Sequence, residues 1–396
     1  MTQPATEPAT QPVARRTWAT LLVAATAVAG LGVGGVLSPA TAGSPAGTAP
    51  DPAVQQQLDA LVTGGGFPGA LAAVRDEDGA EHDLTAGVGD LTTGAPVPVD
   101  GQVRIASNTK TFTAAVVLQL VDEGLVDLEA PIEQYLPGLV RGPGGDGAAI
   151  TVRQLLQHTS GLPDYDHVLV ADYLAVQHRY VEPHQLLDVA LAQPALFAPG
   201  DGWEYSNTNY VLAGLLVQEV TGRPIGEVIT DRVIEPLGLD DTYWPLEGEQ
   251  ELRGEHPQGY FATAPDVAWT DVTTQDPSFG WAAGQLVSTP DDLLDFFTAL
   301  VDGELLSPAM LAEMQTTVPA PGATVRGDES YGLGLQTFTL SCGGTAWTHG
   351  GDIPGTETRG AVLPGGEGVV LAVTALPTTT ERAEAVEATV DAVLCG

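Results

Sequence analysis

The sequence predicts an α/β (α+β) fold in which an antiparallel sheet flanked by helices is built from both ends of the chain. Three observations predict it. Strand-like runs occur near the N-terminus, mainly helical segments joined by Pro- and Gly-rich loops fill about 125–277, and strand-like runs return after about 333. The simplest arrangement joins the two outer parts into one sheet and leaves an inserted all-helical domain between them.

The first elements are a helix and a hairpin. Residues 53–62 read as a short helix that ends at a run of three glycines. Residues 69–75 and 82–89 alternate or run apolar, and Asp78-Gly79 lies between them. That pattern indicates two strands joined by a tight turn.

A long helix is expected to begin at Ser107. Phe112, Val116 and Leu120 recur at helical spacing, which predicts one apolar face. Gly124 follows and is a typical C-terminal cap.

Further helices and the returning strands complete the prediction. A helix over 290–301 is indicated by Thr289, Pro290 and an acidic first turn. The other expected helices are 151–157, 184–193, 207–221 and about 381–393, and the expected strands are 333–340, 345–349, 358–363 and 368–375.

The N-terminus is typical of an export signal. Arg15 and Arg16 precede an apolar run over about 18–37, and Ala40-Thr41-Ala42 offers a small-x-small cleavage site. An uncleaved membrane anchor is the alternative, because the run is nearly long enough to span a bilayer. Glycines interrupt the run, which favours cleavage and a secreted protein. The predicted organisation is a signal peptide (1–42), a flexible leader (43–52), the first part of the sheet domain (53–105), a mainly helical domain (106–277) and the second part of the sheet domain (278–396).

The chain is strongly acidic. It has 51 acidic and 14 basic residues, a formal net charge of −37. Nucleic-acid binding needs a basic surface, so this charge argues against it, and it argues equally against anionic membranes. We expect no nucleic acid and no membrane partner after signal cleavage, and a monomer.

Only two cysteines occur, Cys342 and Cys395. In an exported chain an even pair indicates one disulfide, which would tie the C-terminal tail to an upstream strand. Two free thiols are the alternative.

Lys110 is the only lysine, and Ser107 lies three residues before it. Arginine stays protonated at any usable pH, whereas a desolvated lysine can lose its proton and act as a base. Positions i and i+3 share one helix face, so Lys110 can activate the Ser107 hydroxyl as a nucleophile. A solvated helix lysine is the alternative, because a four-residue match carries a real risk of coincidence.

Two further polar clusters stand out. Tyr205-Ser206-Asn207 precedes an apolar helix, and His349-Gly350-Gly351 ends a predicted strand. Taken singly, each cluster is more often a cap or a turn than a site. Their order after Ser107-x-x-Lys110 is what gives them weight.

The order Ser-x-x-Lys, Tyr-x-Asn, His-x-Gly resembles that of the penicillin-binding and class C β-lactamase-like serine hydrolases. The resemblance extends over about 53–396 and is closest to the secreted D-alanyl-D-alanine carboxypeptidases/transpeptidases of actinomycetes. It implies a β-lactamase/transpeptidase-like fold. The additional stretches that carry it are Leu118–Gly124, Tyr205–Asn209, Tyr331–Leu335, Leu340–Gly343, Cys395-Gly396 and the family-like segment His158–Leu162.

The resemblance also implies roles. Ser107 would form an acyl-enzyme, and Lys110 and Tyr205 would share the proton transfers. The ammonium group of Lys110 can lower the pKa of the Tyr205 phenol. The oxyanion would be held by the backbone N–H groups of Ser107 and of Asp352, which follows Gly351 on the edge strand after His349. Asn207 would bind a substrate amide carbonyl, and His349 would relay protons or orient the leaving group. No metal or organic cofactor is implied.

The pattern departs from the carboxypeptidases where they bind a free substrate carboxylate. Gly350, Asp352 and Gln336 stand where those enzymes carry hydroxyl residues and an arginine. An aspartate repels a carboxylate, and a glutamine lacks the charged fork of arginine, although Arg359 could compensate. The departure leaves the acylation machinery intact. The function predicted from the resemblance is an exported serine hydrolase that acts through an acyl-enzyme, is D-alanyl-D-alanine carboxypeptidase-like, and cleaves a peptide or amide bond in cell-wall-type substrates. The alternatives are an esterase or β-lactamase on the same machinery, and a slowly acylating penicillin-binding sensor.

Overall fold

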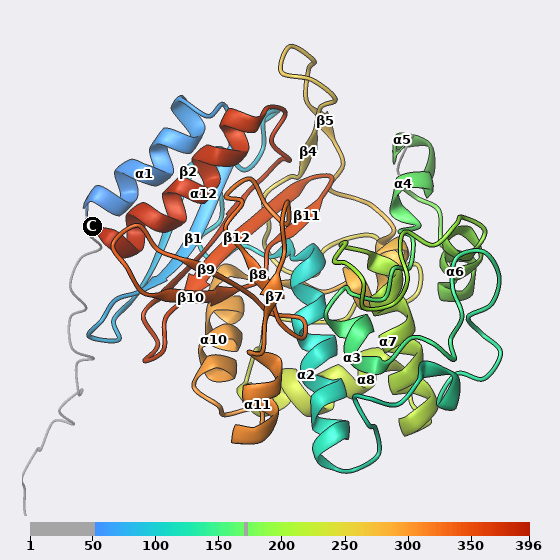
Figure 1. The fold of residues 1–396 in the computed structure, drawn as a ribbon. Coiled ribbons are helices and arrows are strands. Elements are labelled where there is room, and N and C mark those ends of the chain that lie inside the picture. The colour runs from blue at the N-terminus through green and yellow to red at the C-terminus, as the bar shows by residue number, and fades with distance from the viewer. Residues whose placement is uncertain (1–51, 170–172) are drawn as a thin grey trace, which may run out of the picture. The chain divides into compact units, whose positions relative to one another are not determined.

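A sheet built from both ends of the chain forms the centre of the fold (Figure 1). The computed structural model describes residues 52–169 and 173–396. The strand order is β2-β1-β13-β12-β10-β9-β8-β7, with β11 paired to β12, and the pairing is antiparallel; Ala70 of β1, for example, lies opposite Val373 of β13. The predicted antiparallel sheet is confirmed. Its strands are β1 (Gly69–Arg75), β2 (Glu81–Gly87), β7 (Val318–Pro319), β8 (Ser330–Tyr331), β9 (Gln336–Thr339), β10 (Thr345–Thr348), β11 (Gly351–Ile353), β12 (Thr356–Val362) and β13 (Gly368–Val373).

Helices cover both faces of the sheet. The terminal helices α1 (Pro52–Thr63) and α12 (Thr380–Cys395) pack on one face, and α10 (Pro290–Val301) packs on the other (Figure 1). Alternate side chains of β1 separate accordingly: Ala70 and Ala72 join the core under α1 and α12, whereas Leu71 joins the core on the opposite side. A strand buried on both faces needs small and apolar residues, and β1 has them over its buried residues 69–74.

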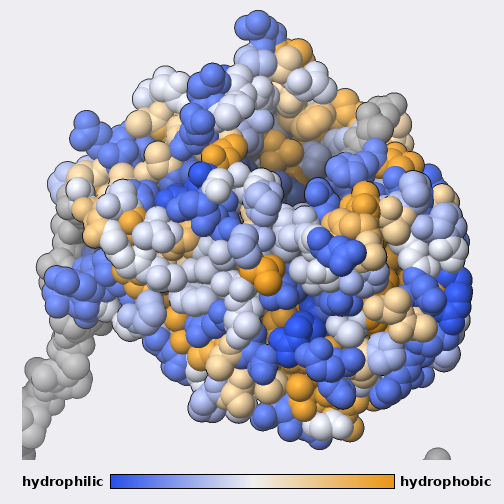
Figure 2. Space-filling view, in the orientation of Figure 1, coloured by the Kyte–Doolittle hydropathy of each residue, from blue (hydrophilic) through white to orange (hydrophobic). Residues whose placement is uncertain are grey.

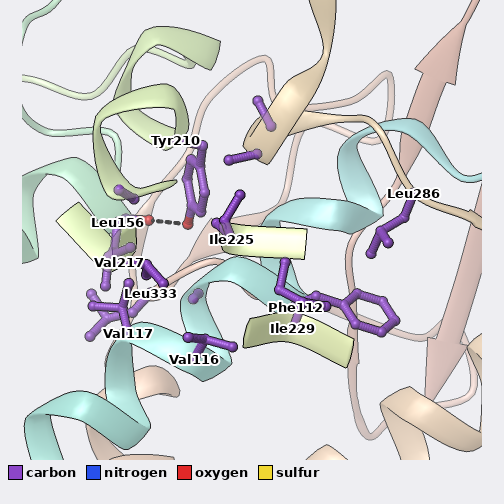
Figure 3. Packing of buried hydrophobic residues seen from close by; sticks show 14 of the residues in the cluster. Phe112, Val116, Val117, Leu156, Tyr210, Val217, Ile225, Ile229, Leu286 and Leu333 are labelled. Carbon is purple, nitrogen blue, oxygen red and sulfur yellow. Dashed lines mark hydrogen bonds between the residues drawn. The ribbon is translucent and has the colours of Figure 1, made fainter. Parts of the chain in front are cut away.

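Helix α2 (Thr109–Asp122) lies within the helical layer beside the sheet. Most of its residues are buried, so the helix is enclosed around nearly its whole circumference, with polar buried residues in its first turns and apolar ones after them. Figure 3 shows Phe112 and Val116 of α2 packed among side chains of the neighbouring helices, and the Tyr210 hydroxyl donating to the Leu156 carbonyl. The surrounding helices are α3 (Val152–Leu156), α4 (Asp166–Leu169), α5 (Tyr173–Val176), α6 (Pro183–Leu191), α7 (Asn207–Thr221), α8 (Ile225–Ile229), the π-helix η4 (Thr230–Ile234), α9 (Glu235–Leu237) and α11 (Pro308–Met314).

Most expected elements occur, with informative exceptions. The strand expected over 333–340 is shorter, because Gly334 has a φ of +77° and turns the chain before β9 begins. β11 is too short to show a periodic pattern in the sequence, and only the resemblance placed Asp352 on a strand after His349. The mainly helical segment also contains a two-stranded ribbon, β4 (Tyr260–Phe261) with β5 (Thr270–Asp271), and β3 (Val103–Arg104) pairs with β6 (Val287–Ser288).

The predicted signal peptide and residues 43–51 of the predicted leader lie outside the described residues, whereas Pro52 begins α1; the other domain boundaries stay predictions. No helix among residues 52–169 and 173–396 is long and apolar enough to cross a membrane.

The predicted pairing of Cys342 with Cys395 is present, with a Cα–Cα distance of 5.4 Å. It joins the turn after β9 to the end of α12. Asp391 of α12 reinforces the same junction, because it accepts the Ser341 backbone N–H at 2.9 Å.

We predict that replacing Cys342→Ser together with Cys395→Ser lowers the free energy of unfolding by about 4 kcal/mol, because the unfolded chain regains the freedom of an open loop. Urea denaturation measures the difference. Wild-type protein unfolded in reducing agent should match the double variant. A difference below about 1 kcal/mol would contradict the loop-closure account.

Candidate active site

Ser107 lies in a turn that connects β3 to α2. The turn is the 3-10 helix η1 (Ala106–Asn108), and Ala106 has a φ of +46°, a left-handed conformation that is strained for a residue with a side chain. Asn108 holds the turn in place, because its Nδ2 donates to the Ile105 carbonyl at 2.8 Å and to the Thr358 hydroxyl of β12 at 2.7 Å. The turn is thereby tied to the sheet.

β11 approaches this turn so closely that only glycine fits at its first position. A Cβ atom on Gly351 would lie 2.2 Å from the Ile105 carbonyl oxygen and 2.7 Å from Nδ2 of Asn108. The absence of a side chain lets the β11 backbone, with Asp352 next in line, lie against the turn that carries Ser107.

Lys110 lies beneath Ser107 and is fully buried. Its Nζ donates to Ser107 Oγ at 3.0 Å, to Asn207 Oδ1 at 2.7 Å and to the Ala283 carbonyl at 2.7 Å. An ammonium group has three donors, and all three are used. The structure therefore brings the predicted hydroxyl and amine together, and it rules out the solvated-lysine alternative.

Burial controls the protonation of Lys110. It lowers the pKa of this lysine from 10.5 to about 7, while the charges of Asp164, Asp166 and Asp352 raise it. The acidic chain favours the ammonium form, yet local desolvation is the larger effect. Lys110 can therefore give up a proton near neutral pH.

Tyr205 borders the same pair. The Lys110 Nζ lies 4.9 Å from the centre of its ring. The expectation that the ammonium lowers the phenol pKa is wrong: burial raises the pKa of Tyr205 well above its ordinary value, Tyr331 raises it further, and the hydrogen bond with Ser107 lowers it. Of the two groups, Lys110 is the one whose pKa lies close to neutrality.

Asn207, the first residue of α7, is held from two sides. Its Oδ1 accepts from Lys110, and its Nδ2 donates to Asp164 Oδ2 at 3.0 Å. The backbone N–H of Asn207 donates to the same oxygen at 3.0 Å. One amide N–H of the side chain is left for a further acceptor.

His349 lies directly after β10 and is buried, with both ring nitrogens engaged. Nε2 lies 2.9 Å from the Tyr331 hydroxyl, and Nδ1 lies 2.6 Å from the carbonyl of Gly350. The ring is therefore close to the other predicted residues, but its polar atoms face the protein.

A pocket of about 320 Å³ opens beside Ser107, and Lys110 lies behind its lining. The pocket lies between β11 and the segment leading into α4, where Figure 2 shows the surface hollowed above the middle of the view. The predicted residues that line it are Ser107, Tyr205, Asn207, Gln336, His349, Gly350 and Asp352.

The pocket is lined by more acidic than basic groups. Asp164, Asp166, Glu204 and Asp352 line it, together with Arg359. Burial and the charge of Asp164 raise the pKa of Asp166 to about 6, and Lys110 lowers it.

Arg359 is not available to bind a substrate carboxylate. Its guanidinium contacts Asp352 at 3.0 Å, Glu357 at 2.7 Å and Glu387 at 2.8 Å. Burial raises the pKa of Glu357, yet Asp352 and Glu387 are enough to balance the charge of the guanidinium, so the possible compensation by Arg359 is not realised.

Sequence reasoning did not identify Asp164, Ala283 and Tyr331 as parts of the site. Asp164 belongs to none of the motifs and lies two residues after the family-like segment His158–Leu162. Tyr331 was noted only for the resemblance. Ala283 contributes a backbone carbonyl, which no residue pattern can reveal. In the described part of the chain, no group of three or more His, Cys, Asp or Glu residues is arranged to hold a metal ion.

The sheet, the helical layer and the Ser107–Lys110 pair define a serine hydrolase of the β-lactamase and penicillin-binding class. The chain belongs to the Beta-lactamase family, whose sequence profile matches residues 54–394.

Similar proteins include amidohydrolases and a penicillin-binding protein. A D-stereospecific amidohydrolase from Streptomyces sp. is 39% identical, with a TM-score of 0.77 over 85% of this chain and 97% of that one. D-amino acid amidase from Ochrobactrum anthropi SV3 is 30% identical, with a TM-score of 0.76 over 86% and 96%. Penicillin-binding protein 4 of Amycolatopsis lactamdurans is 29% identical over 75% of this chain and 74% of its own length. The chain spans only 38% to 49% of the length of several other curated relatives.

We predict that Gly351→Ala lowers the rate of acylation of Ser107 by about a hundredfold without unfolding the protein, because the added Cβ pushes β11 away from η1 by a fraction of an ångström or more. Labelling by a fluorophosphonate probe measures the rate. Ile353→Val, on the same strand and without a clash, is the matched control. Equal labelling of Gly351→Ala and wild type would show that the close approach of β11 is not needed.

Proposed function

We propose that this protein is a serine acyl-transfer hydrolase in which Ser107 forms an acyl-enzyme and Lys110 accepts the hydroxyl proton. The 3.0 Å contact between Ser107 Oγ and Lys110 Nζ supports the proposal most strongly, together with the lowering of the lysine pKa to about 7. A base whose pKa lies near the working pH combines the correct protonation state with a useful driving force.

The steps after proton transfer use groups on both sides of Ser107. The alkoxide attacks the substrate carbonyl, and the resulting oxyanion is held by the backbone N–H groups of Ser107 and Asp352. The free N–H of the Asn207 amide binds a second carbonyl of the substrate. Lys110 returns its proton to the leaving group, and water then releases the acyl group by the same route in reverse.

The pocket favours substrates that carry a free ammonium group on the acyl side. Asp164, Asp166 and Glu204 supply negative charge, and Arg359 is already paired with carboxylates. A cationic group gains from such surroundings, whereas a free carboxylate is repelled. The likeness to a D-amino acid amidase and a D-stereospecific amidohydrolase supports amides of amino acids, D-configured ones included, as the substrate class.

The predicted carboxypeptidase activity toward D-alanyl-D-alanine is the second candidate. The likeness to a penicillin-binding protein supports it, and the charge of the pocket opposes it. We also propose export, which the disulfide between Cys342 and Cys395 supports because disulfides persist in oxidising compartments.

A substrate panel tests the proposal. Wild-type protein should hydrolyse D-alanine p-nitroanilide with a higher kcat/KM than its N-acetylated analogue, an N-acylated D-Ala-D-Ala peptide, a chromogenic cephalosporin or nitrophenyl butyrate. Ser107→Ala serves as the blank. Preference for the D-Ala-D-Ala peptide would overturn the proposed substrate class, and failure of every compound to acylate Ser107 would overturn the proposed activity.

The pH profile tests the role of Lys110. The base must be neutral to accept a proton, so kcat/KM should rise as the pH rises through about 7 and then level off. Lys110→Arg keeps the charge but cannot give up its proton, and should lower kcat/KM by about a thousandfold. Near-normal activity of this variant, or a flat profile for wild type, would remove the lysine from proton transfer.

Asp166→Asn tests recognition of the ammonium group. The KM for D-alanine p-nitroanilide should rise about tenfold, while the N-acetylated analogue is unaffected. Because the carboxylate form binds the cation, the wild-type KM for the free amine should fall as the pH rises through about 6, the pKa of Asp166. Asp240→Asn, at an exposed aspartate outside the pocket lining, is the control; equal shifts for both substrates would contradict the assignment.

A further inference from the structure

A hydrogen-bonded chain of buried side chains runs behind the pocket and links two of the motif segments. His158 Nε2 lies 3.2 Å from the Tyr331 hydroxyl, and that hydroxyl lies 2.9 Å from Nε2 of His349. All three residues are buried. The groups at the two ends of this hydrogen-bonded chain determine the tautomers of its two histidine rings.

The His158 end must accept hydrogen bonds at Nδ1. The backbone N–H of Ser206 points to this nitrogen at 3.2 Å, and a backbone N–H can only donate. Asn209 Nδ2 lies 3.0 Å from the same nitrogen, while Asn209 Oδ1 accepts the Ser160 hydroxyl. A neutral His158 therefore carries its proton on Nε2 and donates it to Tyr331.

The His349 end must donate at Nδ1. The Gly350 carbonyl lies 2.6 Å from this nitrogen, and a carbonyl can only accept. A neutral His349 therefore carries its proton on Nδ1, and its Nε2 accepts the Tyr331 hydroxyl proton. Tyr210, another buried tyrosine of this region, donates its own hydroxyl proton to the Leu156 carbonyl.

We propose that His158 and Tyr331 are positioning residues that fix His349 as its Nδ1–H tautomer, and that His349 holds the Gly350 carbonyl rather than exchanging protons with the substrate. This proposal deepens the proposed function, on which its kinetic part rests. It replaces the proton-relay role that the resemblance implied for His349.

The held carbonyl matters because of where Gly350 lies. The carbonyl of Gly350 and the N–H of Gly351 share one planar peptide group, so fixing one fixes the other. Gly351 opens β11, and Asp352 follows with the N–H proposed for the oxyanion. The hydrogen bonds that run from His158 through Tyr331 to His349 thus set the orientation of β11 at its first residue.

The charge state of the two rings agrees with this arrangement. Burial and the charge of Lys110 lower the pKa of His349 to about 3, although its bond to Gly350 raises it, and Arg359 lowers it further. Burial also lowers the pKa of His158 well below its ordinary value. A second proton on His349 would sit on Nε2 and face the Tyr331 hydroxyl proton, which already points at that nitrogen. The hydrogen bonds therefore also favour the neutral ring.

Nitrogen NMR of histidine-labelled protein tests the tautomers without any substrate. The chain has 7 histidines, and spectra of His349→Asn and His158→Asn assign the two signals. We expect His349 protonated at Nδ1 and His158 at Nε2, with neither titrating between about pH 5 and 8. The opposite tautomer at either ring, or titration of His349 in that range, would overturn the proposal.

Kinetics with nitrophenyl butyrate test the consequence. An asparagine amide can keep the Nδ1-side bond to Gly350, so His349→Asn should lose about tenfold in kcat where His349→Ala loses about a hundredfold. Equal losses would indicate proton transfer by the imidazole and contradict the proposal. If wild type fails to hydrolyse this ester, the proposed function fails, and the NMR result still decides the tautomers.

Tyr331→Phe removes the hydroxyl that links His158 to His349. We expect kcat to fall about tenfold with little change in KM, because the loss concerns a donor used in the transition state. Tyr173→Phe also deletes one buried tyrosine hydroxyl, whose partner is Gln275, and serves as the stability-matched control. Equal kcat in the two variants would show that the Tyr331 hydroxyl is only structural.

Discussion

Lys110 is shielded from water beneath Ser107, and the helices packed around α2 maintain that burial. A buried ammonium is unfavourable by several kcal/mol unless it is paired, and among residues 52–169 and 173–396 no carboxylate forms an ion pair with Lys110. Its partners are a hydroxyl, an amide oxygen and a backbone carbonyl. These neutral acceptors are enough to hold the ammonium in place but do not prevent it from losing a proton. An aspartate in place of Asn207 would raise the pKa of the lysine again.

Two levels of electrostatics act in opposite directions. The chain as a whole carries a formal charge of −37, which favours cations everywhere on its surface. Within the protein, desolvation of Lys110 outweighs that field, and Arg359 is balanced by Asp352 and Glu387. Reactivity therefore depends on burial, whereas substrate preference depends on which charges the pocket leaves uncompensated.

The sequence was sufficient for the sheet, the long helices and the reacting pair, because each leaves a periodic or compositional pattern. The alternation in β1 and the lone lysine beside Ser107 are such patterns. It was not sufficient for β11, which is too short for periodicity, or for the Ala283 carbonyl, which any residue could supply. The pKa of Tyr205 was predicted in the wrong direction, since burial depends on tertiary packing. The tautomers of His158 and His349 likewise follow only from their partners in space.

The pairing of β1 with β13 has a consequence for how the protein is made. Ala70 faces Val373 across the sheet, so the interior strand β1 can pair with β13 only after about three hundred further residues have been made. Contacts this distant in sequence form slowly. During synthesis the β1–β2 hairpin would emerge with one apolar edge open and exposed to aggregation. The sheet can close only after residues 368–373 have been synthesised, so protection of the early hairpin by a chaperone suits this topology.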